Sequence, residues 1–380
     1  MHKFFKVLFF LLYFLLYACK PAAVNTESAE VDFKDSEQIK YARGFTIKEF
    51  KDYTQVVVRN PWDTTKVLET YLLIARESRL PDNLPPGTVV RIPVQRVGLC
   101  SSIFAGVYSQ LNALAKVVAV SDPDYFNFKE IRDGVQSGTI SDLGLASSLN
   151  TEMVLASQLD ILVVSPFEVS TTDRLKDFGI NVVSNASYME VSPLGRTEWI
   201  KFDAAFLGKL REATKLFDAI EERYLKLSAI IPNNRIRPTV IAEKKYGDTW
   251  YISGGDSYMA QFYKHAGADY VFAHLRHTGS IPMSFENVFK KSINADFWLI
   301  KYHNTTKNLT LKELGEEYDL YKRFDAFSTG NIYGLNSGLT PYYERGQLEP
   351  DVVLSDLVAI FHPDLLPGYT PVYFKKLHSK

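Results

Sequence analysis

The chain has 380 residues, of which 46% are hydrophobic and 23% are charged, and its formal net charge is −1. This composition is that of a globular protein long enough for two domains, and the near-zero charge gives no electrostatic reason to expect a nucleic-acid partner. The two cysteines, Cys19 and Cys100, are too few for a disulfide framework.

The N-terminus has the layout of an export signal. Basic residues precede an apolar run from Val7 to Tyr17, which is long enough for a signal peptide and too short to span a bilayer. The ending Leu-Tyr-Ala-Cys19 resembles a bacterial lipobox, in which the cysteine is lipidated and becomes the new N-terminus. We therefore expect a signal peptide over residues 1–18 and a lipid-anchored tether over residues 19–43. A plain signal peptide or a short anchor is the alternative.

Residues 44–195 are predicted to form a first lobe. Its first part is β-rich, and beyond Leu99 short apolar strands alternate with helices, which is typical of a largely parallel sheet with covered faces. The expected strands are Gly44–Phe50, Thr54–Arg59, Val67–Ala75, Thr88–Leu99 with a break at Pro93, Val117–Val120, Ile161–Val164 and Val182–Ser184. The expected helices are Ser102–Leu114, Thr151–Gln158 and Thr172–Phe178.

The stretch from Arg196 to Ser228 is predicted to be one continuous helix with Thr197 as its N-cap. Its large apolar residues recur at steps of three and four, which places them on one face of a helix. Only Gly208 interrupts the run, so the helix should be roughly 45 Å long. We interpret residues 196–230 as a connecting helix between two lobes; an ordinary amphipathic core helix is the alternative.

Residues 231–380 repeat the alternation of strands and helices and are predicted to form a second lobe. The expected strands are Thr239–Ala242, Trp250–Ser253, Tyr270–Phe272 and Phe297–Lys301, and the expected helices are Asp256–Ala266, Phe285–Lys291 and a closing helix around Asp351–Phe361.

Both halves share a local pattern of a capped helix followed by a strand that begins after an aspartate. In the first half Asn150-x-Glu152-x-Val154 precedes Asp160 and the strand ILVV. In the second half Ser284-x-Glu286-x-Val288 precedes Asp296 and the strand FWLI. One acid at a helix start is usually part of a cap, but two in equivalent places indicate duplicated lobes.

In their order and spacing these features resemble the helical-backbone class of periplasmic substrate-binding proteins, which serve ABC importers for vitamin B12, iron-siderophores and haem. The resemblance covers roughly residues 88–380, whereas the β-rich segment 31–87 has no counterpart in the family core. It rests on the strand Val94–Leu99 with its CSS turn and on the segments LNTEMVLASQLDILVV, PLGRTEWIKF, PMSFENVFKKSINADFWLI and DLVAIFHPDLLP.

The resemblance implies an α/β fold of two Rossmann-like lobes with mostly parallel sheets, joined by one rigid helix, with the ligand in the cleft between them. Closure of the lobes should then be small. It also implies that Glu152 and Glu286 dock into arginine pockets of a permease, where charge pairing would set orientation. The alternative is that both residues only cap their helices.

Loops that follow the carboxyl ends of strands should line the cleft. They nominate nine ligand-binding residues: Cys100, Ser101, Ser102, Phe167, Tyr188, Tyr246, Trp250, Tyr251 and Tyr333. Aromatic walls suit a large, partly apolar ligand such as a corrin, a porphyrin or a catecholate complex. No cluster of arginines occurs in these loops, which disfavours a strongly anionic ferric chelate and favours a corrinoid or a less charged complex.

The resemblance therefore implies a periplasmic, monomeric lipoprotein that captures a metal chelate (a corrinoid such as cobalamin, haem or a ferric siderophore) and delivers it to an ABC permease and its ATPase. It would need no cofactor and catalyse no reaction. The alternatives are a binding protein for free zinc or manganese, which would use His265, His274 and His277, an extracytoplasmic hydrolase, and a purely structural lipoprotein. The sequence has no Walker A, GxGxxG or GxSxG motif.

Overall fold

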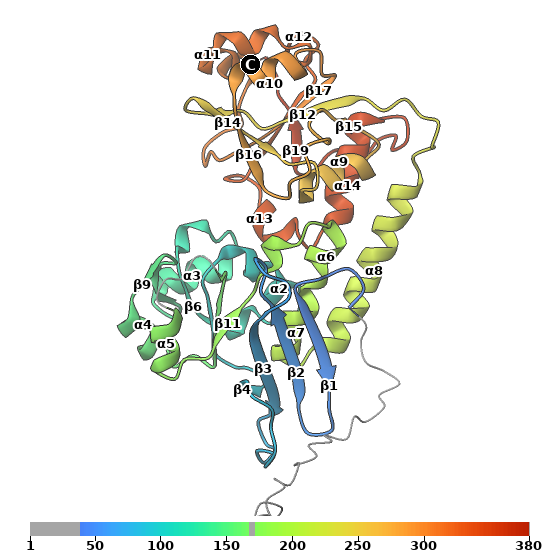
Figure 1. Cartoon of the computed structure of the whole chain (residues 1–380). Coiled ribbons are helices and arrows are strands. Elements are labelled where there is room, and N and C mark those ends of the chain that lie inside the picture. Colours follow the sequence, from blue (N-terminus) through green and yellow to red (C-terminus); the bar gives the residue numbers. More distant parts are fainter. Residues whose placement is uncertain (1–38, 167–171, 380) are drawn as a thin grey trace, which may run out of the picture. The chain divides into compact units, whose positions relative to one another are not determined.

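In the computed structural model, which describes residues 39–166 and 172–379, the chain is an α/β protein with a parallel sheet in each of two lobes and an additional N-terminal sheet (Figure 1). The predicted signal peptide, Cys19, most of the tether and Phe167 lie outside the described residues. The prediction of two α/β lobes is confirmed.

The β-rich N-terminal segment forms a four-stranded sheet that packs on the first lobe. Its strands lie in the order β1 (Phe45–Glu49), β2 (Thr54–Arg59), β3 (Val67–Ala75) and β4 (Thr88–Ile92), antiparallel except for the parallel pair β3/β4. The buried Tyr71 hydroxyl donates to the Val182 carbonyl at 3.2 Å and accepts from the Ser184 amide at 2.8 Å. Because these two residues belong to the sheet of the first lobe, the N-terminal sheet shares that lobe's core.

The first lobe contains a five-stranded parallel sheet in the order β11-β10-β5-β6-β7. Its strands are β5 (Val97–Leu99), β6 (Val117–Val120), β7 (Ser141–Asp142), β10 (Ile161–Val164) and β11 (Val182–Ser184), and a small hairpin joins β8 (Gly144–Leu145) to β9 (Ser148–Leu149). Its helices are α2 (Ser102–Gln110), α3 (Lys129–Ser137), α4 (Thr151–Ala156) and α5 (Thr172–Asp177).

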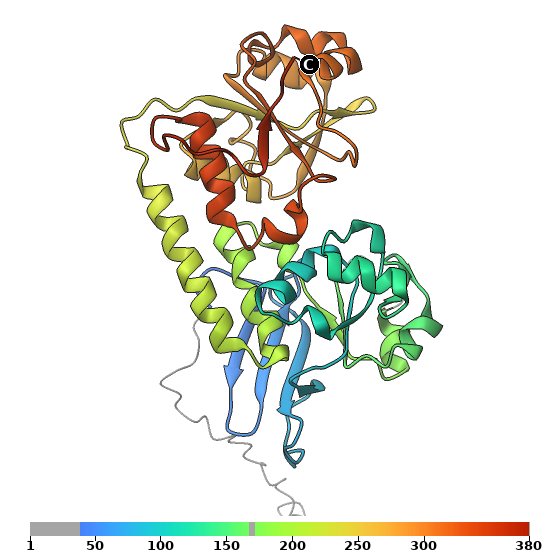
Figure 2. The ribbon, with the colours of Figure 1, turned by 180° about the vertical axis from the view of Figure 1, so that it is seen from behind.

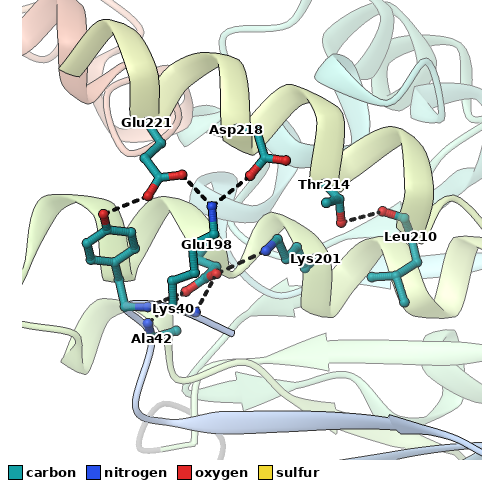
Figure 3. Close-up of polar contacts among 9 residues, drawn as sticks. Lys40, Ala42, Glu198, Lys201, Leu210, Thr214, Asp218 and Glu221 are labelled. Carbon is teal, nitrogen blue, oxygen red and sulfur yellow. Dashed lines mark hydrogen bonds and ion pairs between the residues drawn. The ribbon is translucent and has the colours of Figure 1, made fainter. Parts of the chain in front are cut away.

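The prediction of one continuous helix from Arg196 to Ser228 was wrong. The segment forms α6 (Pro193–Glu198), α7 (Ile200–Leu207) and α8 (Leu210–Ala229). Gly208 has φ +67°, and the amides of Gly208 and Lys209 donate to the carbonyls of Ala205 and Ala204, a Schellman motif that ends α7. The chain then turns back, so that α7 and α8 lie side by side (Figure 3).

The link between the lobes is therefore α8 alone, which has 20 residues and is roughly 30 Å long. It lies beside α14 (Pro350–Phe361) of the second lobe (Figure 2), and Arg223 Nε pairs with Asp351 Oδ2 at 2.5 Å. Most of the predicted apolar face is buried: Trp199, Phe202, Phe206, Ala213, Phe217, Ile220 and Tyr224. Its other two large residues, Leu210 and Leu227, are half-buried.

The predicted N-cap, Thr197, is not at a helix start. Ser192 caps α6 by accepting a hydrogen bond from the Gly195 amide, and Pro193 occupies the first helical position, where its missing N–H costs nothing. The Thr197 hydroxyl instead donates to the Gln347 carbonyl at 2.6 Å, a contact between α6 and the second lobe.

The residues that precede β1 are bonded to these helices. The fully buried Glu198 carboxylate accepts hydrogen bonds from the amides of Lys40, Tyr41 and Ala42 at 2.7–2.9 Å and pairs with the buried Lys201 at 3.0 Å (Figure 3). Lys40 Nζ lies 2.7 Å from Glu221 on α8. The predicted tether over residues 19–43 is therefore too long at its C-terminal end, because residues 40–43 are part of the folded structure.

The second lobe contains a five-stranded sheet in the order β15-β12-β17-β18-β19, parallel except for β19. Its strands are β12 (Thr239–Ala242), β15 (Asp269–Tyr270), β17 (Phe297–Tyr302), β18 (Ile332–Asn336) and β19 (Phe374–Lys376), and a separate antiparallel sheet holds β13 (Lys245–Tyr246), β14 (Thr249–Ser253) and β16 (Ser280–Ser284). Besides α14, its helices are α9 (Tyr258–His265), α10 (Phe285–Ser292), α11 (Leu311–Glu317), α12 (Asp325–Ser328) and α13 (Tyr342–Arg345).

A buried carboxyl group in α7 predicts how stability depends on pH. Asp203 is 1% exposed and accepts a hydrogen bond from Asn185 Nδ2 at 3.0 Å, and burial raises its pKa to about 8. Since its pKa in the unfolded chain is about 3.9, the folded state favours the protonated form, and stability is lost as the pH rises from about 4 towards 8. Between pH 5 and 7 the wild type should lose up to about 2–3 kcal/mol more unfolding free energy than Asp203→Asn. Urea unfolding at both pH values checks this, and parallel profiles would contradict it.

Candidate ligand-binding cleft

A cavity of about 840 Å³ lies between the two lobes, at the carboxyl ends of β5, β6, β17 and β18. Its volume is within the range of small-molecule sites. The lining residues from the first lobe are Cys100, Ser101, Ser102, Ile103, Asp122, Asp124, Tyr125, Asn127, Ala146 and Ser147, and those from the second lobe are His303, Thr305, Ser337, Gly338 and Tyr343.

A second cavity of about 830 Å³ borders the N-terminal sheet and the loop of residues 78–83. It does not lie at the carboxyl ends of the lobes' parallel strands, where open α/β sheets bind their ligands. We therefore take the cavity between the lobes as the candidate site.

In the first lobe, hydrogen bonds to backbone groups fix the loops that line the cavity. Cys100, between β5 and α2, donates its amide proton to the Val163 carbonyl of the neighbouring strand at 2.9 Å. Asp122, after β6, has φ 48°, a left-handed conformation that aspartate tolerates better than most residues. Its amide donates to the Gly144 carbonyl at 2.9 Å and its Oδ2 accepts from the Ala146 amide at 2.7 Å. These two bonds join the loop after β6 to the β8–β9 hairpin.

In the second lobe, the buried Asn336 at the end of β18 joins the two loops that reach the cavity. Its Oδ1 accepts from the amides of Asn304 at 2.9 Å and Gly338 at 3.0 Å, and its Nδ2 donates to the Lys307 carbonyl at 3.0 Å. These bonds bring His303 and Ser337 together, with 3.2 Å between His303 Nδ1 and Ser337 Oγ.

The lobes meet beside the cavity, where α13 packs on α2. Glu344 Oε1 accepts from the Asn127 amide at 2.7 Å, and a Cβ on Gly106 would lie 1.7 Å from the Glu344 carbonyl oxygen, so only glycine allows this approach. Burial raises the pKa of Glu344. Tyr343 of α13 and Tyr125 of the first lobe both line the cavity, and these two residues remain 51% and 63% exposed.

Two cations close to these elements are engaged elsewhere. Lys301, near the end of β17, pairs with Glu243 at 2.8 Å. Arg196 Nη2 donates to the carbonyls of Tyr188 at 2.6 Å and Glu190, and its guanidinium lies 3.9 Å from the centre of the Tyr258 ring. Neither cation is among the residues that line the cavity.

The structure brings three of the nine predicted ligand-binding residues together at the cavity, namely Cys100, Ser101 and Ser102. Tyr188 is half-buried beside Arg196 and does not border the cavity. Tyr246 and Tyr251 are 83% and 48% exposed on the antiparallel sheet.

Trp250 and Tyr333 were placed wrongly in the cleft. Trp250 is fully buried in β14 and stacks on Trp298 with 5.6 Å between ring centroids. Alternate residues of a strand face opposite sides of the sheet, and the Trp250 side chain lies on the side that faces the core. Tyr333 lies within β18, opposite Leu299 of β17. β18 was not among the predicted strands, so its first residues were expected to form a loop.

Sequence reasoning missed the aromatic side chains that do line the cavity. Tyr125 and Tyr343 were not nominated. Tyr125 lies in the loop after the predicted strand Val117–Val120, and the expectation that such loops line the cleft applies to this loop as well. Tyr343 lies beyond β18, so recognition of that strand was necessary to find it.

The two predicted docking carboxylates are exposed, and each lies in the first turn of its helix. Asn150 caps α4 with bonds from the amides of Glu152 and Met153, and Ser284 caps α10, which carries Glu286. Neither glutamate side chain forms an ion pair with any residue of the described ranges. The aspartates that follow these helices also correspond, since Asp160 accepts from amides just before β5 and Asp296 accepts from the first amide of β12.

Two of the three histidines considered as metal ligands have other partners, and the third, His274, is exposed. His265 Nδ1 is 2.7 Å from the Tyr224 hydroxyl, and His277 Nδ1 accepts from the Gly279 amide. Over residues 39–166 and 172–379, no group of three or more histidine, cysteine, aspartate or glutamate residues could hold a metal ion.

Comparison with protein families identifies this architecture. The sequence profile described as "periplasmic binding protein" matches residues 102–339, which include large parts of both lobes and most of the residues around the cavity. The chain belongs to the periplasmic binding protein family. This confirms the resemblance seen in the sequence, and it makes the chain a non-enzymatic, substrate-binding component of a transport system.

Two curated relatives of this periplasmic binding protein come from Methanocaldococcus jannaschii, and both are described as uncharacterized lipoproteins. One is 28% identical over 313 residues, which cover 79% of this chain and 72% of the relative. The other is 25% identical over 343 residues, 87% of this chain and 84% of the relative. In the part of the chain that the structure describes, we find no helix with the length and apolar character needed to cross a membrane.

Solved structures share the fold at low identity. A possible iron-binding (periplasmic solute-binding) protein from Staphylococcus epidermidis aligns with TM-score 0.55 and 18% identity, over 71% of this chain and 99% of that one. The periplasmic heme-binding protein of Vibrio cholerae aligns with TM-score 0.57 and 17% identity, over 71% of this chain and 99% of that one. At such identity these likenesses show the fold and not the ligand.

Proposed function

We propose that this periplasmic binding protein is a lipid-anchored component of an ABC importer, which captures a metal chelate between its lobes and delivers it to the permease. The observation that carries the proposal is the cavity of about 840 Å³ at the carboxyl ends of β5, β6, β17 and β18, with one exposed tyrosine from each lobe. Two aromatic rings among hydroxyl and amide groups suit a bulky, partly apolar complex.

Known proteins of this fold support a chelate as the ligand class. They include an ABC-type Fe3+-hydroxamate transport system from Saccharomonospora viridis, with TM-score 0.55 and 16% identity, and the heme-binding protein named above. The lipobox-like ending at Cys19 and the two lipoprotein relatives support an anchored, extracytoplasmic location. A single lipidated cysteine with several acyl chains would hold the protein stably at the membrane.

Isothermal titration calorimetry with cobalamin, haem and a ferric trihydroxamate tests the proposal. Calorimetry is preferable to tryptophan quenching because none of the four tryptophans lines the cavity. We expect saturable 1:1 binding of at least one chelate and no comparable binding of zinc chloride. Binding of zinc alone, or turnover of ester or glycoside substrates, would favour the alternative functions instead.

The same titration tests whether the two tyrosines that line the cavity, Tyr125 and Tyr343, contribute to binding. Tyr125→Ala with Tyr343→Ala should weaken chelate binding at least about tenfold, because exposed tyrosines that become buried by a ligand carry much of the binding energy. The matched control is Tyr251→Ala, whose ring is 48% exposed on a different sheet, and its affinity should stay at the wild-type value. Equal affinities of the double variant and the control would exclude the cavity as the chelate site.

A further inference from the structure

The aspartate, glutamate, lysine and arginine side chains that line the cavity, among the described residues, are all negatively charged. Among the described residues that line it, Asp122 and Asp124 are the only aspartates or glutamates, and there is no lysine or arginine. The remaining polar groups are hydroxyls, the Asn127 amide and the His303 imidazole. A ligand that enters the cavity therefore approaches two carboxylates and meets no side chain that is permanently cationic.

Each of the two carboxylates has at least one oxygen atom that no described residue occupies and that a ligand could therefore contact. Asp122 Oδ2 is bonded to the Ala146 amide at 2.7 Å, whereas its Oδ1 makes no hydrogen bond with any residue of the described ranges. Asp124 is exposed in the turn Pro123–Tyr125, and over the same ranges its carboxylate has neither a hydrogen bond nor an ion pair. The backbone bonds that fix Asp122 also fix this turn, because the Tyr125 amide donates to the Asp122 carbonyl at 3.1 Å.

The negative field of this pair is not neutralised by the two partly buried cations described above. The ammonium group of Lys301 is paired with Glu243 at 2.8 Å, and the Arg196 guanidinium is bound to backbone carbonyls and to the Tyr258 ring. Beside the two carboxylates, the faces of Tyr125 and Tyr343 are further sites that attract cations. The groups that can contact a ligand therefore favour positive charge from both sides of the cleft.

We infer that the cargo of this cleft is a metal chelate with net positive charge, and that Asp122 and Asp124 select it against neutral and anionic chelates of the same shape. The inference rests on the proposed function as a chelate-binding protein. Two unit charges about 4 Å apart near a protein surface interact by enough to change affinity tenfold or more, so one charge on the ligand should be measurable.

Three forms of one ferric trihydroxamate separate charge from shape. Ferrioxamine B carries a terminal ammonium, its N-acetyl derivative is neutral, and its N-succinyl derivative carries a carboxylate, while the metal centre is identical in all three. We expect the full-length protein to bind the ammonium form roughly tenfold more tightly than the acetyl form, and the succinyl form most weakly. The preference should shrink as the salt concentration rises, because salt screens partly exposed charges.

Asp124→Asn tests the assignment with little risk to folding, since this exposed side chain has no partner among the described residues. It should reduce the preference for the ammonium form several-fold, and Asp122→Asn together with Asp124→Asn should remove it. Asparagine can keep both the left-handed conformation and the acceptor for the Ala146 amide at position 122. Asp133→Asn is the matched control, an exposed aspartate on α3 of the same lobe that pairs with Lys129 outside the cavity, and it should behave as wild type.

Equal affinities for the three forms, or tighter binding of the succinyl form, would overturn the inference and leave the proposed function intact. Failure of the ammonium form to bind while cobalamin or haem binds would have the same meaning. If none of the three forms, cobalamin or haem binds, the proposed function itself is wrong.

Discussion

Replacement of Trp250 by alanine is expected to lower the free energy of unfolding by about 3–5 kcal/mol, because it leaves a large cavity in the core of the second lobe. The Trp250 ring is 0% exposed and lies 5.6 Å from Trp298 and 5.9 Å from Tyr321, measured between ring centroids. Its Nε1 donates to the Ala242 carbonyl at 3.1 Å, so the substitution also removes a buried hydrogen bond. Denaturant unfolding monitored by circular dichroism measures the change.

The neighbouring strand offers a matched control for Trp250→Ala. Tyr246 is 83% exposed, and Tyr246→Ala should change stability by no more than about 0.5 kcal/mol. Chelate affinity of the folded Trp250→Ala protein should equal that of the wild type, since this residue does not border the cavity. A variant with wild-type stability and weakened binding would instead place Trp250 at the ligand, as the sequence alone had suggested.

Removal of the two carboxylates that we predict to dock on the permease should abolish uptake and leave binding unchanged. In Glu152→Ala with Glu286→Ala, each lobe loses the exposed acid of its capped helix, and a permease arginine would be left without a partner at the interface. Loss of one member of such a pair costs about 2–5 kcal/mol, so two losses should reduce transport by far more than tenfold. Uptake of radiolabelled chelate in cells that carry the cognate permease measures the effect.

Measurements of stability and of chelate affinity show whether a loss of uptake in the double variant comes from lost docking or from unfolding. The loss of a favourable charge at a helix N-terminus costs only about 0.3–1 kcal/mol, so the double variant should remain folded. Glu130→Ala is the matched control, since Glu130 is also an exposed acid in the first turn of a helix, α3, but lies outside the duplicated pattern. Normal uptake by the double variant, or reduced uptake by Glu130→Ala, would contradict the assignment.

The strands of the first lobe could be predicted because each is a short apolar run between turn signals. Val117–Val120, Ile161–Val164 and Val182–Ser184 have the predicted bounds. The missed elements carry weaker signals. In α3 the only large apolar residues are Ile131 and Val135, too few for a recognisable face, and β18 contains a glycine and an asparagine that interrupt its apolar run.

The long helix shows the limit of periodicity. The apolar spacing continues across Gly208 because α7, which is buried on all sides, and one face of α8 pack into a shared core, so the spacing alone cannot reveal the reversal. Gly208 was the one available signal, and its positive φ requires the folded structure. Likewise, a strand pattern indicates that Trp250 and Tyr251 face opposite sides, but not which side is the core.

The central claim is that the chelate binds in the cavity between the lobes, and a crystal structure of the protein with its bound chelate tests this claim most directly. We predict density for the chelate in the cavity between the lobes, in contact with Tyr125 of the first lobe and Tyr343 of the second. A chelate bound at the cavity beside the N-terminal sheet, with nothing between the lobes, would contradict the account.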